Sequence, residues 1–255
     1  MSTIIFPSPI YGPVHSRRLG LSLGINLLPG DGKICNFDCL YCEIGFNKDG
    51  FTRSKHPARE LVSRELERQL IMMHDAGQQP DVLTFAGNGE PTSHPHFAEI
   101  IDDTIRLRDK WCPKAKISVL SNATFTARAA VREALMKVDN NILKLDTVDN
   151  DYIKKVNRPL QPSYDVNKII DNLKFFNGHV IVQTMFMKGD GTDNTSDEYV
   201  LPWLKAVGEI KPESVMIYTI DRETPDRDLR KATPDELNRI RDRVIDMGIP
   251  CTASY

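Results

Sequence analysis

The chain has 255 residues, 40% hydrophobic and 27% charged, which is enough to bury a large core and too apolar for a disordered protein. Its formal net charge of -2 excludes a strong overall attraction to nucleic acid or anionic lipid. No apolar run approaches the roughly 20 residues that span a bilayer, and the first residues lack the basic segment of a signal peptide. We therefore expect a cytoplasmic protein with no membrane association.

Short β-rich runs alternate with amphipathic helical patterns along the chain. Strands are expected at residues 21–28, 81–87, 116–122, 141–146, 179–187 and 214–220. Helices are expected at residues 58–75, 96–110, 127–138, 165–177, 196–209 and 234–247. Thr126 is a candidate cap for the third helix and Thr233 for the last, and a loop with Pro159 and Pro162 precedes the fourth.

Six strand–helix units of this kind predict a parallel sheet covered by helices. The periodicity leaves two arrangements open, a doubly wound open sheet and a partial barrel. In both, ligands gather at the carboxyl ends of the strands. The residues that directly follow each strand are therefore the candidates for a functional site.

Three of the five cysteines lie in the segment CNFDCLYC, between the first strand and the first helix. In a reducing compartment, thiols clustered like Cys35, Cys39 and Cys42 bind a metal more often than they form disulfides. A closed tetrahedral zinc site needs a fourth ligand, for which His56 is a candidate. A 4Fe–4S cluster held by three cysteines instead leaves one iron open for a small molecule. The two remaining cysteines are isolated, and we interpret them as structural.

The spacing C-x3-C-x2-C, with aromatic Tyr41 before the last cysteine, resembles the signature of radical S-adenosylmethionine (SAM) enzymes. This resemblance implies an α/β fold, a partial (β/α)6 barrel with parallel strands. It also implies that Cys35, Cys39 and Cys42 bind a 4Fe–4S cluster, whose open iron is chelated by SAM with Tyr41 close by. An electron from a donor such as flavodoxin or ferredoxin then cleaves SAM, and the resulting 5′-deoxyadenosyl radical abstracts hydrogen from the substrate.

The segment GNGEPT, which follows the second predicted strand, extends the resemblance. It is similar to the family's Gly-Gly-Glu motif, which implies that Gly87, Asn88, Gly89 and Glu90 hold the SAM ammonium group. Glycine permits close approach of the backbone, and a carboxylate is a natural partner for a cation. Asn88 stands where a second glycine is common, so the local hydrogen bonding is expected to differ.

Later strand ends supply further candidates for cofactor binding. Ser121 and Asn122 follow the third strand, and in the family this position often bonds the SAM ribose or carboxylate; a helix cap is an equally good interpretation. Gln183 interrupts the apolar fifth strand and is expected to point into the site or to be a buried, satisfied amide. Tyr218 lies in the last strand, which in the family passes the adenine, although a core tyrosine is the commoner role.

Several charged residues have no settled role at this level. Lys144 and Asp146 end the fourth strand and either face a polar barrel interior or pair with each other. Arg158 is a weaker candidate for the SAM carboxylate or a substrate. Arg17 and Arg18, in the segment HSRRL, form either a site for an anionic substrate or a solvated basic turn.

The segment YGPVHSRRLGLSLGINLLP resembles a branch of the superfamily related to tRNA wyosine synthases. Wyosine synthases carry further cysteines upstream that bind an auxiliary cluster acting on pyruvate. No cysteine precedes Cys35 here, so that reaction is not expected.

We expect one domain over residues 1–255, with an N-terminal extension (1–20), a six-strand core (21–220) and a C-terminal loop and helix (221–255).

Three hypotheses follow for the function. The first is a single-cluster radical SAM enzyme, similar to an iron–sulfur oxidoreductase, that acts on RNA such as tRNA or on a nucleotide-like substrate. The second is a radical SAM enzyme that modifies a protein or peptide, such as a glycyl-radical activase. The third is a zinc-stabilised binding module without catalysis.

Overall fold

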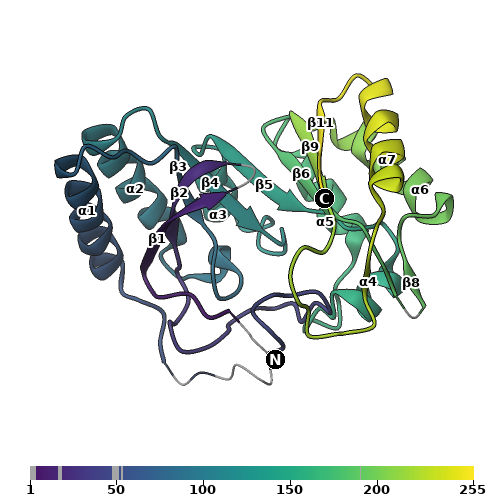
Figure 1. Ribbon diagram of the computed structural model, residues 1–255, viewed down its shortest axis with the longest axis horizontal. Helices are drawn as coiled ribbons and strands as arrows, with labels where there is room; N and C mark the ends of the chain where they lie inside the picture. Colours follow the sequence, from purple (N-terminus) through teal and green to yellow (C-terminus); the bar gives the residue numbers. More distant parts are fainter. Residues whose placement is uncertain (1–3, 17–18, 48–51, 53, 190) are drawn as a thin grey trace.

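The computed structural model describes residues 4–16, 19–47, 52, 54–189 and 191–255 (Figure 1). The strands are β1 (Ile10–Ser16), β2 (Gly20–Ile25), β3 (Val82–Phe85), β4 (Lys116–Ser121), β5 (Asn140–Lys144), β6 (Ile181–Met185), β7 (Met187–Gly189), β8 (Thr192–Asp193), β9 (Ser214–Tyr218), β10 (Arg230–Lys231) and β11 (Cys251–Ser254). The helices are α1 (Arg59–Asp75), α2 (Phe97–Trp111), α3 (Ala129–Leu135), α4 (Asn150–Val156), α5 (Val166–Lys174), α6 (Asp197–Ile210) and α7 (Pro234–Asp246), with a 3₁₀ turn η1 (Pro91–Ser93).

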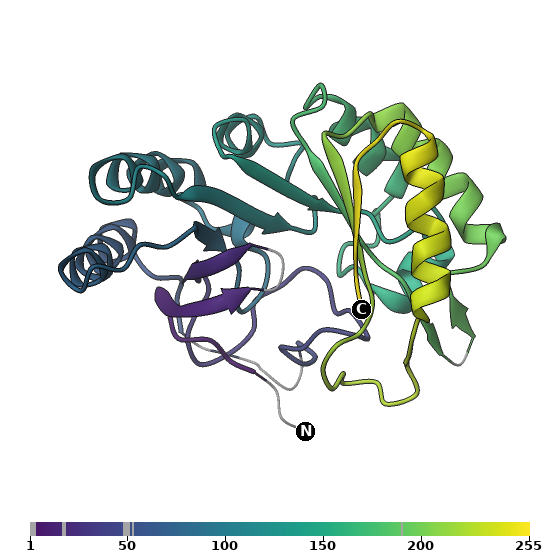
Figure 2. The same ribbon diagram turned by 45° about the horizontal axis from the view of Figure 1, so that its top comes forward.

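Eight strands form one sheet in the order β1-β2-β3-β4-β5-β6-β9-β11. Strand β1 is antiparallel to β2, and each of the other neighbouring pairs is parallel. The sheet curls into a half-barrel with the helices on its convex side (Figures 1 and 2). All six predicted strands are present, and the partial barrel is confirmed over the doubly wound alternative. A small antiparallel sheet, β10-β7-β8, lies outside the barrel order.

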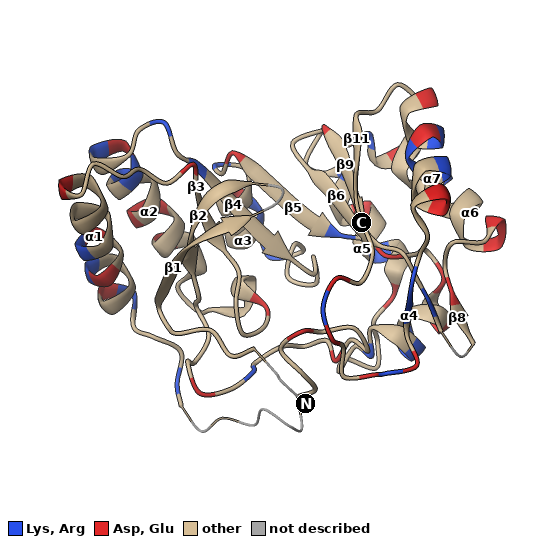
Figure 3. Cartoon of the chain, viewed as in Figure 1, with Lys and Arg blue, Asp and Glu red and all other residues tan. Residues whose placement is uncertain are grey.

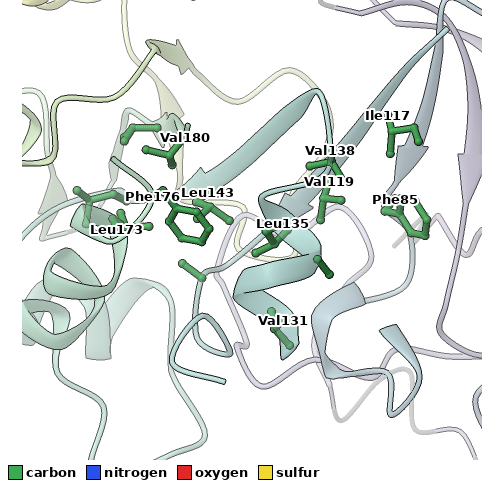
Figure 4. Packing of buried hydrophobic residues seen from close by; sticks show 14 of the residues in the cluster. Phe85, Ile117, Val119, Val131, Leu135, Val138, Leu143, Leu173, Phe176 and Val180 are labelled. Carbon is green, nitrogen blue, oxygen red and sulfur yellow. The ribbon is translucent and has the colours of Figure 1, made fainter. Parts of the chain in front are cut away.

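The hydrophobic core lies between the sheet and its helices, as the apolar periodicity predicts. On α1 the buried residues are Val62, Leu66, Leu70 and Met73, which form the expected stripe. Figure 4 shows how side chains from β4, β5 and the α3 region meet in this layer. A second cluster, which includes Phe37 from the cysteine loop, packs this loop onto the end of the barrel.

Charged residues of both signs are interspersed along the outer helices α1, α2 and α7 (Figure 3). Helix α7 begins at a capping box in which Thr233 accepts from the Glu236 amide and the Glu236 side chain accepts from Thr233, so the predicted Thr233 cap is confirmed. No helix among the described residues is long and apolar enough to cross a membrane.

Some elements differ from the sequence expectation. The predicted loop before the fourth helix contains the short helix α4, which Asp149 caps and which is too brief for its periodicity to stand out. Thr126 does not cap α3, because the N-cap position of this helix is Arg128. The Thr126 hydroxyl instead donates to the Ala123 carbonyl at 2.7 Å. Two segments outside the predicted six-strand core each contribute an edge strand to the sheet. The N-terminal extension contains β1, and the segment predicted as a C-terminal loop and helix contains β11.

Strand β1 was not predicted because Gly12 and Pro13 interrupt its β pattern. Its place in the sheet depends on a close contact between Tyr11 and Gly24, which are register partners. A Cβ atom on Gly24 would lie 2.1 Å from Cζ of Tyr11. The missing side chain of Gly24 therefore makes room for the tyrosine ring on the concave face of the sheet.

We predict that Gly24→Ala destabilises the protein by about 1–3 kcal/mol, because the added methyl overpacks the Tyr11 ring. Urea unfolding measures the change. In a Tyr11→Ala background the same substitution should cost little, since the clash is gone. An equal cost in both backgrounds would contradict the contact.

Candidate functional site

The cysteine segment lies in the long loop between β2 and α1, at the carboxyl end of the sheet. On one side, the Ile34 amide donates to the Asn88 carbonyl (2.9 Å), and the Glu90 amide donates to the Ile34 carbonyl (3.2 Å). On the other side, the amides of Asp38 and Leu40 each donate at 2.9 Å to a carbonyl at the end of α4. The loop is thus clamped between the segment after β3 and the segment after α4.

Hydrogen-bond donors surround two of the three thiols. The donors are the Phe37 amide (3.4 Å) and the Asn122 side chain (3.9 Å) on Cys35, and the Asn157 side chain (3.5 Å) and the Lys144 ammonium (3.7 Å) on Cys39. Burial raises the pKa of Cys35 to about 12 and also raises the pKa of Cys39. Thiolates at these positions therefore need a positively charged ligand, while the surrounding donors suit a sulfur that carries negative charge.

Lys33 is a buried cation at the base of the cysteine loop. Its ammonium donates to the Gly45 carbonyl at 2.7 Å and lies 3.5 Å from the Asp38 carboxylate. Burial by itself lowers the pKa of Lys33, but the three cysteines and Asp38 raise it overall. Lys33 is therefore placed to compensate negative charge on the loop.

Tyr41 faces away from solvent into a buried polar network. Its hydroxyl donates to the Asp146 carboxylate and accepts from the Asn157 amide at 3.1 Å. Lys144 lies over the tyrosine ring, 4.3 Å from its centroid, and forms an ion pair with Asp146 at 3.2 Å. Burial, followed by the nearby Asp146, raises the pKa of Tyr41, so the phenol stays protonated and acts as a donor.

The GNGE segment approaches the cysteine loop so closely that glycine is required. Gly89 has a φ of +140° and forms a parallel bridge with Ile34. A Cβ atom at Gly89 would lie 1.8 Å from the Ile34 carbonyl oxygen. Gly87, with a φ of +142°, is packed in the same way against the Asn26 side chain.

Asn88 occupies the position where the family commonly has a second glycine, and its side chain is fully engaged. The amide nitrogen donates to the carbonyls of Phe6 (2.9 Å) and Pro29 (2.8 Å), and the amide oxygen accepts from the Phe6 amide (2.9 Å). The side chain therefore ties the N-terminal segment to the site. Only the backbone of Asn88 faces the cysteine loop, through its bond to Ile34.

Glu90 is a buried carboxylate next to Cys35. It accepts from the Thr92 amide (3.0 Å) and hydroxyl (2.5 Å), from the Ser121 hydroxyl (2.8 Å) and from the Asn122 amide (2.7 Å). Burial raises the pKa of Glu90, and these hydrogen bonds offset part of the effect. In the part of the chain that the structure describes, no cation pairs with Glu90, so its buried charge suits a positively charged ligand.

The structure brings Ser121 and Asn122 to this point rather than to a helix cap, since the N-cap position of α3 is Arg128. Asn122 joins the two halves of the site: its backbone amide binds Glu90, and its side chain contacts the Cys35 sulfur.

The described residues bear on the choice between a single ion and a cluster. Among these residues, no three His, Cys, Asp or Glu side chains are arranged so that they could hold a single metal ion. One tetrahedral zinc requires its thiolates within about 4 Å of each other, given Zn–S bonds near 2.3 Å. The predicted fourth ligand, His56, instead lies beside His94, with tilted rings whose centroids are 5.4 Å apart.

The concave face of the half-barrel encloses a cavity of about 530 Å³. Gln183 lines it, and among the described residues its side chain has no hydrogen-bond partner. The strands contribute mainly neutral residues to the wall: Ser22, Thr84, Leu120, Ile142, Gln183 and Met216. Tyr11 and His15 of β1, and Arg222 from the segment after β9, also line it. Tyr218 instead lines a small neighbouring cavity of about 50 Å³ together with Tyr41.

The remaining charged candidates are placed as follows. Lys144 and Asp146 pair with each other, as one of the two interpretations predicted, and they do so beside Cys39. Arg158 lies over the Phe46 ring, 5.2 Å from its centroid. Arg17 and Arg18 fall outside the described residues.

Asn157 and Lys33 are two site residues that the sequence analysis missed. Asn157 bonds Cys39, Tyr41 and Asp146, although it lies at the end of a helix that was not predicted. Lys33, two residues before Cys35, had a local signal, because a lysine beside clustered thiols compensates their charge.

Three comparisons with known proteins agree with this geometry. The chain matches the model of the radical SAM superfamily over residues 31–198. It is 30% identical to a protein of Helicobacter pylori named UPF0026 protein, over 91% of this chain and 72% of that protein.

Two solved structures share the fold. A radical SAM methyltransferase from Sphaerobacter thermophilus superposes with a TM-score of 0.69 at 16% identity, covering 92% of this chain and 66% of that one. SuiB of Streptococcus suis bound to S-adenosylmethionine superposes with a TM-score of 0.63 at 16% identity, covering 88% of this chain. The chain spans about half of SuiB, 49% of its length.

We predict that Gly89→Ala separates the two loops of the site. The substitution combines an unfavourable φ with a backbone clash, so the free energy of unfolding should fall by about 3 kcal/mol or more. Gly77→Ala is the matched control, because Gly77 also has a positive φ of +68° but has nothing within 4 Å of an added Cβ. Chemical denaturation compares the two variants, and equal losses would show that the contact with Ile34 is unimportant.

Proposed function

This chain belongs to the radical SAM superfamily, and from that premise we propose that Cys35, Cys39 and Cys42 hold one 4Fe–4S cluster whose open iron binds SAM. The chain is a radical SAM enzyme, and its cofactors are the cluster and SAM. When bound, the cluster supplies one electron, received from a donor such as flavodoxin or ferredoxin, that cleaves SAM to a 5′-deoxyadenosyl radical able to abstract hydrogen from a substrate.

The observation that carries this proposal is the junction made by Asn122. This one residue contacts both the sulfur of Cys35 and the carboxylate of Glu90, so a ligand on the cluster lies beside a buried anion. An amino group of SAM bound to the open iron would be polarised by the metal, and its N–H groups would donate to the Glu90 carboxylate. Ser121 and Asn122 orient the Glu90 carboxylate, and the backbone of the GNGE segment lines the same place.

A single cluster is supported by the positions of the other two cysteines. Cys112 is buried at the C-terminal end of α2, and Cys251 lies in the edge strand β11. Both are separated in the fold from the cysteine loop. The zinc-stabilised binding module is set aside by membership of the radical SAM superfamily.

For the substrate, we propose a nucleotide-like molecule or an RNA. The cavity of about 530 Å³ is large enough for a nucleobase with its sugar, and the packed rings of Phe6 and Tyr11, with centroids 4.5 Å apart, form an aromatic part of its wall. The side-chain amide of Gln183, which has no partner among the described residues, carries a donor and an acceptor side by side, which suits the edge of a base. At the same cavity Arg222 is paired with Glu43 at 2.8 Å, so a phosphate bound there would compete with this ion pair. Tyr218 is proposed to lie near the adenine of SAM.

The substrate proposal is tested with deuterium-labelled candidates under reducing, anaerobic conditions. Deuterium transfer into 5′-deoxyadenosine from labelled tRNA or nucleosides supports it. Transfer from a labelled peptide or protein instead would favour the alternative, a protein-modifying enzyme.

We predict that alanine substitution at each of positions 35, 39 and 42 abolishes cluster uptake and reductive cleavage of SAM. Anaerobic reconstitution, iron counting and chromatography of 5′-deoxyadenosine provide the measurements. Cys112→Ala and Cys251→Ala are the matched controls and should retain both properties. A reconstituted wild-type protein that holds one zinc and no iron would contradict the proposal.

We predict that Glu90→Gln weakens SAM binding about 10- to 100-fold, the loss expected for one buried, charge-assisted hydrogen bond of about 1.5–3 kcal/mol. Equilibrium dialysis of labelled SAM against the reconstituted protein measures the affinity, and the iron content of the variant should stay at the wild-type level. Glu99→Gln, at an exposed position on α2, serves as the control. Unchanged affinity in the Glu90 variant would remove Glu90 from the SAM site.

A further inference from the structure

A partly buried cation, Lys144 on strand β5, lies next to Cys39. The ammonium of Lys144 is 3.7 Å from the Cys39 sulfur, and the lysine side chain is only 16% exposed. It lies 3.2 Å from the Asp146 carboxylate and over the Tyr41 ring. The three contacts fix a positive charge against one of the proposed cluster ligands.

We propose that Lys144 is a positioning residue for electron transfer, which sets the reduction potential of the cluster through its contact with Cys39. The inference rests on the proposed function, because it requires the cluster on the three cysteines. Asp146, Tyr41 and Asn157 hold the lysine and its sulfur partner in place.

The direction of the effect follows from charge. Reduction adds one electron, taken from a flavodoxin- or ferredoxin-type donor, and so adds one negative charge beside Cys39. A cation 3.7 Å away stabilises the reduced state more than the oxidised state, and burial strengthens the interaction because little water screens it. Lys144 therefore raises the potential and makes the cluster easier to reduce.

Asp146 does not cancel this effect, because the pair is oriented. The Asp146 carboxylate is held by the Tyr41 hydroxyl, by the Asn157 amide at 2.9 Å and by the Met185 amide at 3.0 Å. These donors spread its negative charge. The Asn157 amide also lies between the carboxylate and the sulfur, since it donates to both.

The test is a potentiometric titration of the reconstituted protein, followed by electron paramagnetic resonance. Lys144→Met removes the charge but keeps the length of the side chain. We expect its midpoint potential to be more negative by at least the equivalent of a tenfold change in the reduction equilibrium, which is about 59 mV for one electron. Lys144→Arg keeps the charge and should titrate near the wild type. Lys110→Met removes an exposed lysine paired with Glu67 and should not change the potential.

A second variant keeps the test informative if Lys144→Met folds poorly. Lys144→Met leaves Asp146 buried without its cation, so the double variant Lys144→Met/Asp146→Asn removes both charges and should still shift the potential downward. A loaded variant that titrates at the wild-type potential overturns the inference and leaves the proposed function intact. If neither variant takes up iron while Lys110→Met does, Lys144 acts in assembly, which also overturns it. A wild-type protein that takes up no cluster refutes the proposed function itself.

Discussion

The site depends on one contact, the pairing of the backbone at Ile34 with the backbone at Gly89. This contact joins the loop after β2 to the loop after β3, and it exists only because Gly89 has no side chain. It sets Cys35 beside Glu90, although the two residues belong to different strand–helix units. A proposed cluster ligand and a carboxylate suited to a polar or positively charged ligand are thereby brought together.

The opposite side of the cysteine loop is held by the end of α4. Backbone bonds from this segment fix Asp38 and Leu40, and the Asn157 side chain reaches the Cys39 sulfur. The loop therefore rests on two supports contributed by β3 and by the β5–β6 crossover. A polar side chain also reaches a thiol on each side of the loop, Asn122 from the segment after β4 to Cys35, and Asn157 from the end of α4 to Cys39.

Much of the fold and part of the site could be predicted from the sequence. The alternation of strands and helices is a strong local pattern, and the cysteine spacing and GNGE segment are short motifs with specific chemistry. Asn157 was missed because its role comes from the topology, which brings α4 against a loop more than a hundred residues earlier. The edge strands β1 and β11 were missed because backbone pairing with a neighbouring strand, and not the β propensity of their own residues, makes them strands. The side-chain bonds of Asn88 likewise depend on the N-terminal segment, which no local pattern places there.

The central claim is that an iron left open by Cys35, Cys39 and Cys42 binds the amino acid end of SAM beside Glu90. Electron–nuclear double resonance on the reduced, reconstituted protein tests it directly, with SAM carrying ¹⁵N in its amino group. We predict a resolved ¹⁵N coupling to the cluster that is present with the wild-type protein and lost when Cys39 is replaced. A reduced cluster that binds SAM without any such coupling would contradict the account.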